Sequence, residues 1–62
     1  MSYFVSFHDH GKKVYLNVNE INFVIESRKG KACIYDNQGN IFNSDETMNE
    51  FLKKLQIYCE EN

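Results

Sequence analysis

Apolar residues recur at alternate positions in a series of short segments, and residues typical of turns separate these segments. In the first segment, Tyr3, Val5 and Phe7 share one face of an extended chain, because successive side chains of a strand point to opposite sides. Gly11 and Gly30 lie in the intervening turns and can adopt the positive φ that short turns require. The pattern predicts strands at about residues 3–8, 13–18, 21–27, 31–36 and 40–43.

The last segment has a three- and four-residue period, which is typical of an amphipathic helix. Its apolar stripe consists of Met48, Phe51, Leu52, Leu55, Tyr58 and Cys59. Asn43 or Ser44 can cap a helix here, and Glu46 is placed as in a capping box. We therefore expect a helix over about residues 44–60. The predicted fold is a single α+β domain over residues 1–62, an antiparallel β-meander of about five strands with one C-terminal helix packed on one face.

The size of the chain limits its stability. A domain of 62 residues buries only about 60% of its unfolded surface, and small folds often gain stability from a disulfide, a metal or a second subunit. Cys33 and Cys59 are the two cysteines. With no basic-then-apolar leader visible, we expect both to be reduced and buried, with a Cys33–Cys59 disulfide as the alternative. No apolar run is long enough for a membrane span, so we expect a cytoplasmic protein without a membrane partner.

Three stretches together carry a resemblance to a known family: "GKKVYLNVNEINFVIES", "ACIYDNQGNIF" and "SDETMNEFLKKL". They contain a strand that begins with Gly-Lys, a second strand that ends in Ile-Glu, a hairpin with Gly, and a helix with spaced leucines. Over residues 11–55 the chain resembles the first half of LytTR-type DNA-binding domains, and it is also similar to the small flagellar FlbD-like proteins. The LytTR resemblance implies a nucleic-acid-binding regulator.

The charges suggest one candidate site. The net charge of −2 argues against a general nucleic-acid coat protein, which would be basic. In a meander, the turns at residues 9–12 and 27–30 lie at the same end of the sheet, where Asp9, Asp45 and Glu46 would weaken a positive field. The basic residues expected there are Lys12, Lys13, Arg28, Lys29 and Lys31. They form either an anion-binding tip or ordinary solvated turns.

The face of the sheet that the helix does not cover suggests a second candidate site. Its predicted apolar residues are Phe4, Tyr15, Val24, Cys33 and Tyr35, and Ile57 lies opposite the helix stripe. A half-solvated antiparallel sheet is one interpretation. We favour a dimer or partner interface formed by Phe4, Tyr15, Val24, Tyr35 and Ile57, because exposed apolar patches mark interaction sites and a two-fold dimer is the commonest assembly.

The stretch "FHDHGKK" places His8 and His10 two residues apart. In a strand they would point to the same side, and Cys33 and Cys59 would complete a zinc site only if the fold brought them there. We interpret the stretch as the end of a hairpin with solvated imidazoles. Phosphate-binding loops and nucleophile elbows are not recognisable in the sequence. We therefore expect no catalytic residues, no cofactor, no metal and no enzymatic activity.

These observations predict a small non-enzymatic protein that binds another protein and acts as a homodimer. Its Lys-, Asn- and Ile-rich composition is typical of an AT-rich bacterial or phage genome, where such proteins are often regulators or inhibitors; a phage protein would act in the host cytoplasm. The alternative is a nucleic-acid-binding transcriptional regulator that uses the basic turns. A third hypothesis is an enzyme or metalloprotein built on His8, His10 and the cysteines.

Overall fold

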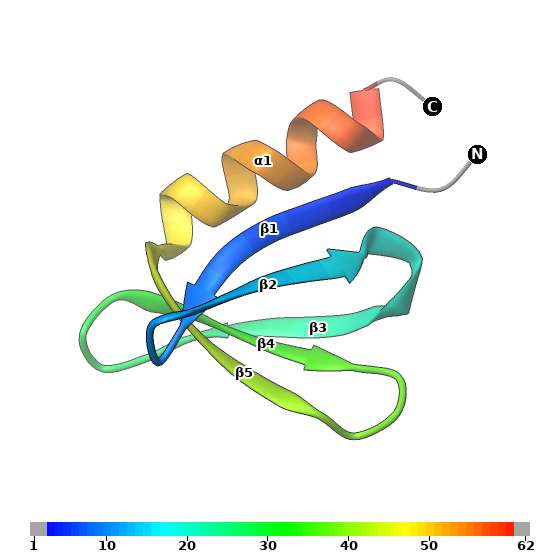
Figure 1. Cartoon of the computed structure of the whole chain (residues 1–62). Helices are drawn as coiled ribbons and strands as arrows, with labels where there is room; N and C mark the ends of the chain where they lie inside the picture. Colours follow the sequence, from blue (N-terminus) through cyan, green and yellow to red (C-terminus); the bar gives the residue numbers. More distant parts are fainter. Residues whose placement is uncertain (1–2, 61–62) are drawn as a thin grey trace.

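The computed structural model describes residues 3–60, with the side chains of residues 3–56. A short 3₁₀ helix, η1 (Val18–Glu20), connects the second strand to the third. The other elements are, in chain order, β1 (Phe4–Asp9), β2 (Lys12–Asn17), β3 (Ile21–Glu26), β4 (Lys31–Asp36), β5 (Ile41–Thr47) and α1 (Met48–Glu60). The predicted α+β class is confirmed: five antiparallel strands form an open sheet, and the C-terminal helix packs against it (Figure 1).

The strand order is β2-β1-β5-β4-β3, so the meander predicted from the sequence holds only for β3, β4 and β5. β2 and β3 are consecutive in the chain but lie at opposite edges of the sheet. β1 pairs with β2 along its whole length and joins β5 at Asp9↔Ser44. Hydrogen bonds hold η1 at both ends, from Val18 N to Tyr3 O (2.9 Å) and from Asn37 N to Glu20 O (2.8 Å). η1 carries the chain from the β2 edge of the sheet to the β3 edge, and these two hydrogen bonds anchor it.

The core lies between the sheet and α1. Its buried apolar residues are Val5, Phe7, Leu16, Ala32, Ile34 and Phe51. The Phe7 ring meets the rings of Phe42 and Phe51 edge to face, at centroid distances of 5.9 and 5.8 Å, an arrangement that aromatic pairs favour. β1, β5 and α1 therefore meet around one phenylalanine.

The helix stripe is only partly as predicted. Phe51 is fully buried, and Met48 and Leu55 pack against the core, whereas Leu52 keeps 43% of its surface exposed. The side chains of Tyr58 and Cys59, also assigned to the stripe, lie outside the described residues. A polar contact fixes the helix over β1, because Lys54 Nζ donates to Ser6 O at 2.7 Å and also pairs with Glu46.

The helix begins later than the sequence suggested. The strand predicted to end at residue 43 continues to Thr47, and Ser44 is buried within it, with its Oγ accepting from Glu46 N at 3.0 Å. Thr47 and Glu50 form the capping box instead: Glu50 Oε1 accepts from Thr47 N (2.9 Å), and Thr47 Oγ1 accepts from Glu50 N (3.2 Å). The prediction of a cap at Asn43 or Ser44 is wrong, because pairing with β1 and β4 keeps those residues extended.

An irregularity in β3 reverses the faces of its side chains. The register against β4 shifts between Ile21 and Phe23, which inserts one extra residue in β3, as in a β-bulge. Ile21 and Val24 consequently both pack against the core, while Phe23 and Ile25 are exposed. The prediction that Val24 lies on the open face with Tyr35 is wrong, because simple alternation does not continue through the bulge.

Candidate interaction surface

The strands β3, β4 and β5 present an apolar surface on the side of the sheet opposite the core. Along β4, Ala32, Ile34 and Asp36 are buried, so the alternating Cys33 and Tyr35 point outward. Direct pairing adds neighbours to this face: Ile25 pairs with Cys33, Phe23 with Tyr35, and Ile41 with Tyr35. We call this surface the outer face; it consists of Phe23, Ile25, Cys33, Tyr35 and Ile41.

Three large apolar residues of the outer face are exposed to solvent. Phe23, Ile25 and Ile41 keep 46%, 47% and 53% of their surface exposed. Phe23 and Ile25 belong to β3 and Ile41 belongs to β5, the two strands that flank Tyr35 on β4. The exposed residues are therefore neighbours in one patch rather than scattered single residues. Scattered exposed apolar side chains are common on any protein, whereas a contiguous patch marks an interaction site.

Two contacts order the centre of this patch. The rings of Phe23 and Tyr35 stack at a centroid distance of 4.4 Å with an interplanar angle of 16°. Cys33 Sγ donates a weak hydrogen bond to Asn43 Oδ1 at 3.5 Å. Cys33 is a free thiol and is only half-buried, which differs from the predicted burial. The side chain of Cys59, its hypothetical disulfide partner, lies outside the described residues.

The structure distributes the predicted interface residues over several places. Tyr35 lies on the outer face, whereas Val24 packs inward. Phe4 and Tyr15 are exposed on the hairpin of β1 and β2 (53% and 66%), and Lys13 Nζ lies 5.8 Å from the centre of the Tyr15 ring. The side chain of Ile57 lies outside the described residues.

Sequence reasoning missed Phe23, Ile25 and Ile41 as candidate interface residues. The run Phe23-Val24-Ile25 supplies apolar side chains to both faces of β3, so it is compatible with either orientation. Apolar residues on both faces of one strand indicate that one of the two faces carries apolar side chains outside the core. The choice between the two faces depends on the bulge, which the local pattern does not reveal.

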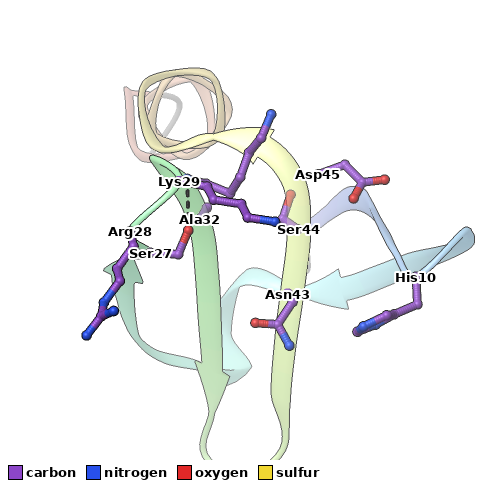
Figure 2. Close-up of a pocket in the computed structure, with 9 residues that line it drawn as sticks. His10, Ser27, Arg28, Lys29, Ala32, Asn43, Ser44 and Asp45 are labelled. Carbon is purple, nitrogen blue, oxygen red and sulfur yellow. Dashed lines mark hydrogen bonds between the residues drawn. The ribbon is translucent and has the colours of Figure 1, made fainter.

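The basic turn residues come together only in part. The β1–β2 turn and the β3–β4 turn lie at the same end of the molecule in Figure 1, and residues of both line a pocket of about 430 Å³. Figure 2 shows the pocket across β5, with Arg28 and His10 at its two sides and Asn43 between them. Its lining residues are His10, Ser27, Arg28, Lys29, Lys31, Ala32, Asn43, Ser44 and Asp45.

Acidic groups accompany the cations of this pocket. Arg28, Lys29 and Lys31 line it, whereas Lys12 and Lys13 are exposed on β2 and are not among its lining residues. Asp45 lies in the same lining. Hydrogen bonds from Thr47 hold the pKa of Glu50 below its ordinary value, and the charge of Lys31 acts in the same direction. Part of the positive field is therefore already offset by carboxylates.

The two histidines occupy different kinds of backbone. His8 is an exposed residue of β1 and pairs with Lys13, whereas His10 lies in the turn, where its Nδ1 contacts Asp9 Oδ1. His10 and Gly11 have φ values of 51° and 80°, the combination that a two-residue type I′ hairpin turn requires. Among the residues whose side chains are described, no three His, Cys, Asp or Glu groups gather as metal ligands would.

Comparisons of the chain with protein-family models, with curated proteins and with solved structures find no match. Within the described part of the chain, no helix has the length and apolar character needed to cross a membrane.

Proposed function

We propose that this chain is a small non-enzymatic regulator or inhibitor that binds another protein, acts as a homodimer and uses the outer face as its contact surface. One observation carries the proposal: Phe23, Ile25 and Ile41 are each about half exposed in one patch around Tyr35. A domain of this size has little apolar surface to spare, because its burial on folding is already low. Apolar side chains placed outside the core therefore favour a role in binding.

The chemistry of the outer face suits a protein partner. An aromatic pair and two isoleucines form an apolar centre, and the neighbouring positions carry polar groups such as Lys31 and Asn43. Protein interfaces have this arrangement, with an apolar and aromatic centre inside a polar rim. Phe23 and Tyr35 are the expected anchors, because a few large side chains carry most of the binding energy.

The test compares two phenylalanines that are each about half exposed. Phe23→Ser removes an aromatic ring from the outer face, and Phe4→Ser removes one from β1, where 53% of the residue is exposed. Binding of the cellular partner, identified by affinity capture and then measured with the purified partner, should weaken about tenfold or more in Phe23→Ser and little in Phe4→Ser. Equal effects of the two substitutions would argue against the outer face.

The homodimer has its own measurement. Light scattering at micromolar concentration should give twice the 7.4 kDa mass of the chain. A species of 7.4 kDa would contradict the dimer and would leave the binding of another protein to be judged by the phenylalanine comparison.

The pocket beside the β3–β4 turn favours a second candidate function, a nucleic-acid-binding regulator, as the LytTR resemblance implies. Arg28→Glu with Lys29→Glu reverses two charges at the pocket, and Lys12→Glu with Lys13→Glu makes the same change away from its lining. This function requires DNA affinity that falls steeply with salt and that only the first pair abolishes. No detectable binding at about 50 mM salt would exclude it.

A further inference from the structure

The open sheet leaves two edge strands, β2 and β3, which differ in how they are protected. Edge strands present unpaired backbone groups that can pair with another chain, and proteins commonly protect them with lysine or proline. β2 begins with Lys12 and Lys13, whereas β3 has the sequence INFVIE, with neither lysine nor proline. β3 also carries the exposed Phe23 and Ile25. Of the two edges, β3 is therefore the one suited to association.

We infer that a second copy of this chain pairs with β3 in antiparallel orientation, with the two-fold axis at Val24. This inference rests on the homodimer of the proposed function and specifies its geometry. In this register Phe23 faces Ile25 of the second copy on the outer face, twice by symmetry, and Val24 faces its own counterpart on the core side. Each of these two pairs sets an aromatic residue directly opposite an aliphatic one, and cross-strand pairs of this kind stabilise sheets.

Charge and face arguments select this register over its neighbours. A slip by one residue would place outward side chains opposite inward ones. An axis at Phe23 would set the exposed Ile25 against Ile21, which packs on the core beyond the bulge. An axis at Ile25 would set Glu26 against Val24. With the axis at Val24, Glu26 meets Asn22, which can donate a hydrogen bond to the carboxylate.

The same pairing extends the surface offered to a partner. Two sheets joined along β3 form one continuous sheet, so the outer faces of both copies lie side by side on the same side of the dimer. The bulge that precedes Phe23 ends the regular part of the strand and increases its local twist. The intermolecular ladder is therefore short, centred on Phe23, Val24 and Ile25, and side-chain contacts have to contribute much of its stability.

A cysteine at the two-fold axis tests the register directly. In a background with Cys33→Ser and Cys59→Ser, Val24→Cys places two thiols opposite each other, at the spacing of directly paired strand residues, which a disulfide can bridge. Glu26→Cys is the matched control: it lies on the same strand and is more exposed, but its counterpart in the dimer is four residues away along the partner strand. Oxidation should yield covalent dimer about tenfold faster for Val24→Cys than for Glu26→Cys, because thiols too far apart cannot be bridged.

Light scattering of the unmodified chain and circular dichroism of each variant complete the test. A dimer in solution with preferential cross-linking at Val24→Cys in a folded protein supports the edge geometry. A dimer in which Glu26→Cys cross-links as fast as Val24→Cys overturns the geometry and leaves the homodimer standing. A monomer at micromolar concentration overturns both.

As a second variant, Ile25→Lys should weaken the dimer about tenfold or more, whereas Tyr15→Lys on the opposite edge should leave it intact.

Discussion

Phe23 on the edge strand β3 lies nearly parallel to Tyr35 on β4, with their ring centroids 4.4 Å apart. The two residues are direct cross-strand partners, and their stack lies on the outer face, away from the core. β3 therefore contributes Ile21 and Val24 to the core and an aromatic ring to the surface. This division makes β3 both a structural edge and the candidate contact strand.

The aromatic stack should stabilise the fold measurably. Phe23→Leu and Tyr35→Leu, made singly and together, form a double-mutant cycle whose coupling should be about 0.5–1.5 kcal/mol in favour of the pair, because stacked rings contribute beyond their buried area. Urea unfolding at one fixed protein concentration measures it, since dissociation of a dimer makes apparent stability depend on concentration. The cycle of Phe23→Leu with Tyr15→Leu is the control, and its coupling should be within about 0.5 kcal/mol of zero. Similar coupling energies in the two cycles would contradict a stabilising interaction specific to the Phe23–Tyr35 pair.

The start of α1 should depend on Thr47. Thr47→Ala removes the hydroxyl that accepts from Glu50 N and should lower the free energy of unfolding by about 1 kcal/mol, the usual loss for a capping residue. Asn43→Ala, at one of the two positions predicted from the sequence as a cap, should change stability by less than about 0.5 kcal/mol, because the residue is exposed. Urea unfolding monitored by far-ultraviolet circular dichroism compares them. A larger loss for Asn43→Ala would contradict the observed cap.

Local patterns in the sequence predict most of the elements. β4 has the predicted bounds of 31–36, β1 and β2 are each displaced by one residue, and β3 ends one residue earlier than predicted. Such differences are within the usual uncertainty of element boundaries. The motif Thr47-Met-Asn-Glu50 also has the spacing of a capping box. It competes with the Asn43–Glu46 pair, and only the pairing of β5 with its neighbours decides between them.

Long-range pairing explains what the sequence does not predict. The contact of Asp9 with Ser44 that joins β1 to β5 depends on which strands meet in space, and hydrophobic alternation is the same for any strand order. The bulge before Phe23 exchanges the faces of β3, so Val24 and Ile25 change roles. Of the predicted interface residues whose side chains are described, Tyr35 lies on the outer face, whereas Val24 packs inward and Phe4 and Tyr15 lie on the hairpin of β1 and β2.

Stability should fall at acid pH through Asp36. Its carboxylate accepts hydrogen bonds from Asn40 Nδ2, Asn40 N and Gln38 N at 2.8–2.9 Å. The side-chain bond from Asn40 is the largest cause that lowers the pKa of Asp36 below its ordinary value, although desolvation opposes it. A lowered folded-state pKa contributes stability above the unfolded value, about 4, and that contribution is lost as the pH falls through the folded value.

Urea unfolding between about pH 5 and pH 3 measures this effect. The midpoint should decrease with falling pH in the wild type and decrease less steeply in Asp36→Asn, which has no carboxyl group to protonate. Some slope should remain, because Glu50 also has a lowered pKa. Asn40→Ala removes the side-chain donor but keeps the backbone N–H, so its slope should be intermediate. A slope for Asp36→Asn equal to that of the wild type would contradict the role of Asp36.

The adjacent residues Phe51 and Leu52 should respond very differently to truncation. Phe51 is fully buried against Phe7, with ring centroids 5.8 Å apart, whereas Leu52 is 43% exposed. Phe51→Ala should lower the free energy of unfolding by about 3–5 kcal/mol through lost burial and a cavity, and Leu52→Ala by less than about 1 kcal/mol. Domains have roughly 0.05–0.15 kcal/mol of stability per residue, so Phe51→Ala should leave much of this short chain unfolded at 25 °C. Circular dichroism and urea unfolding distinguish the two variants, and comparable losses at both positions would show that α1 does not pack through Phe51.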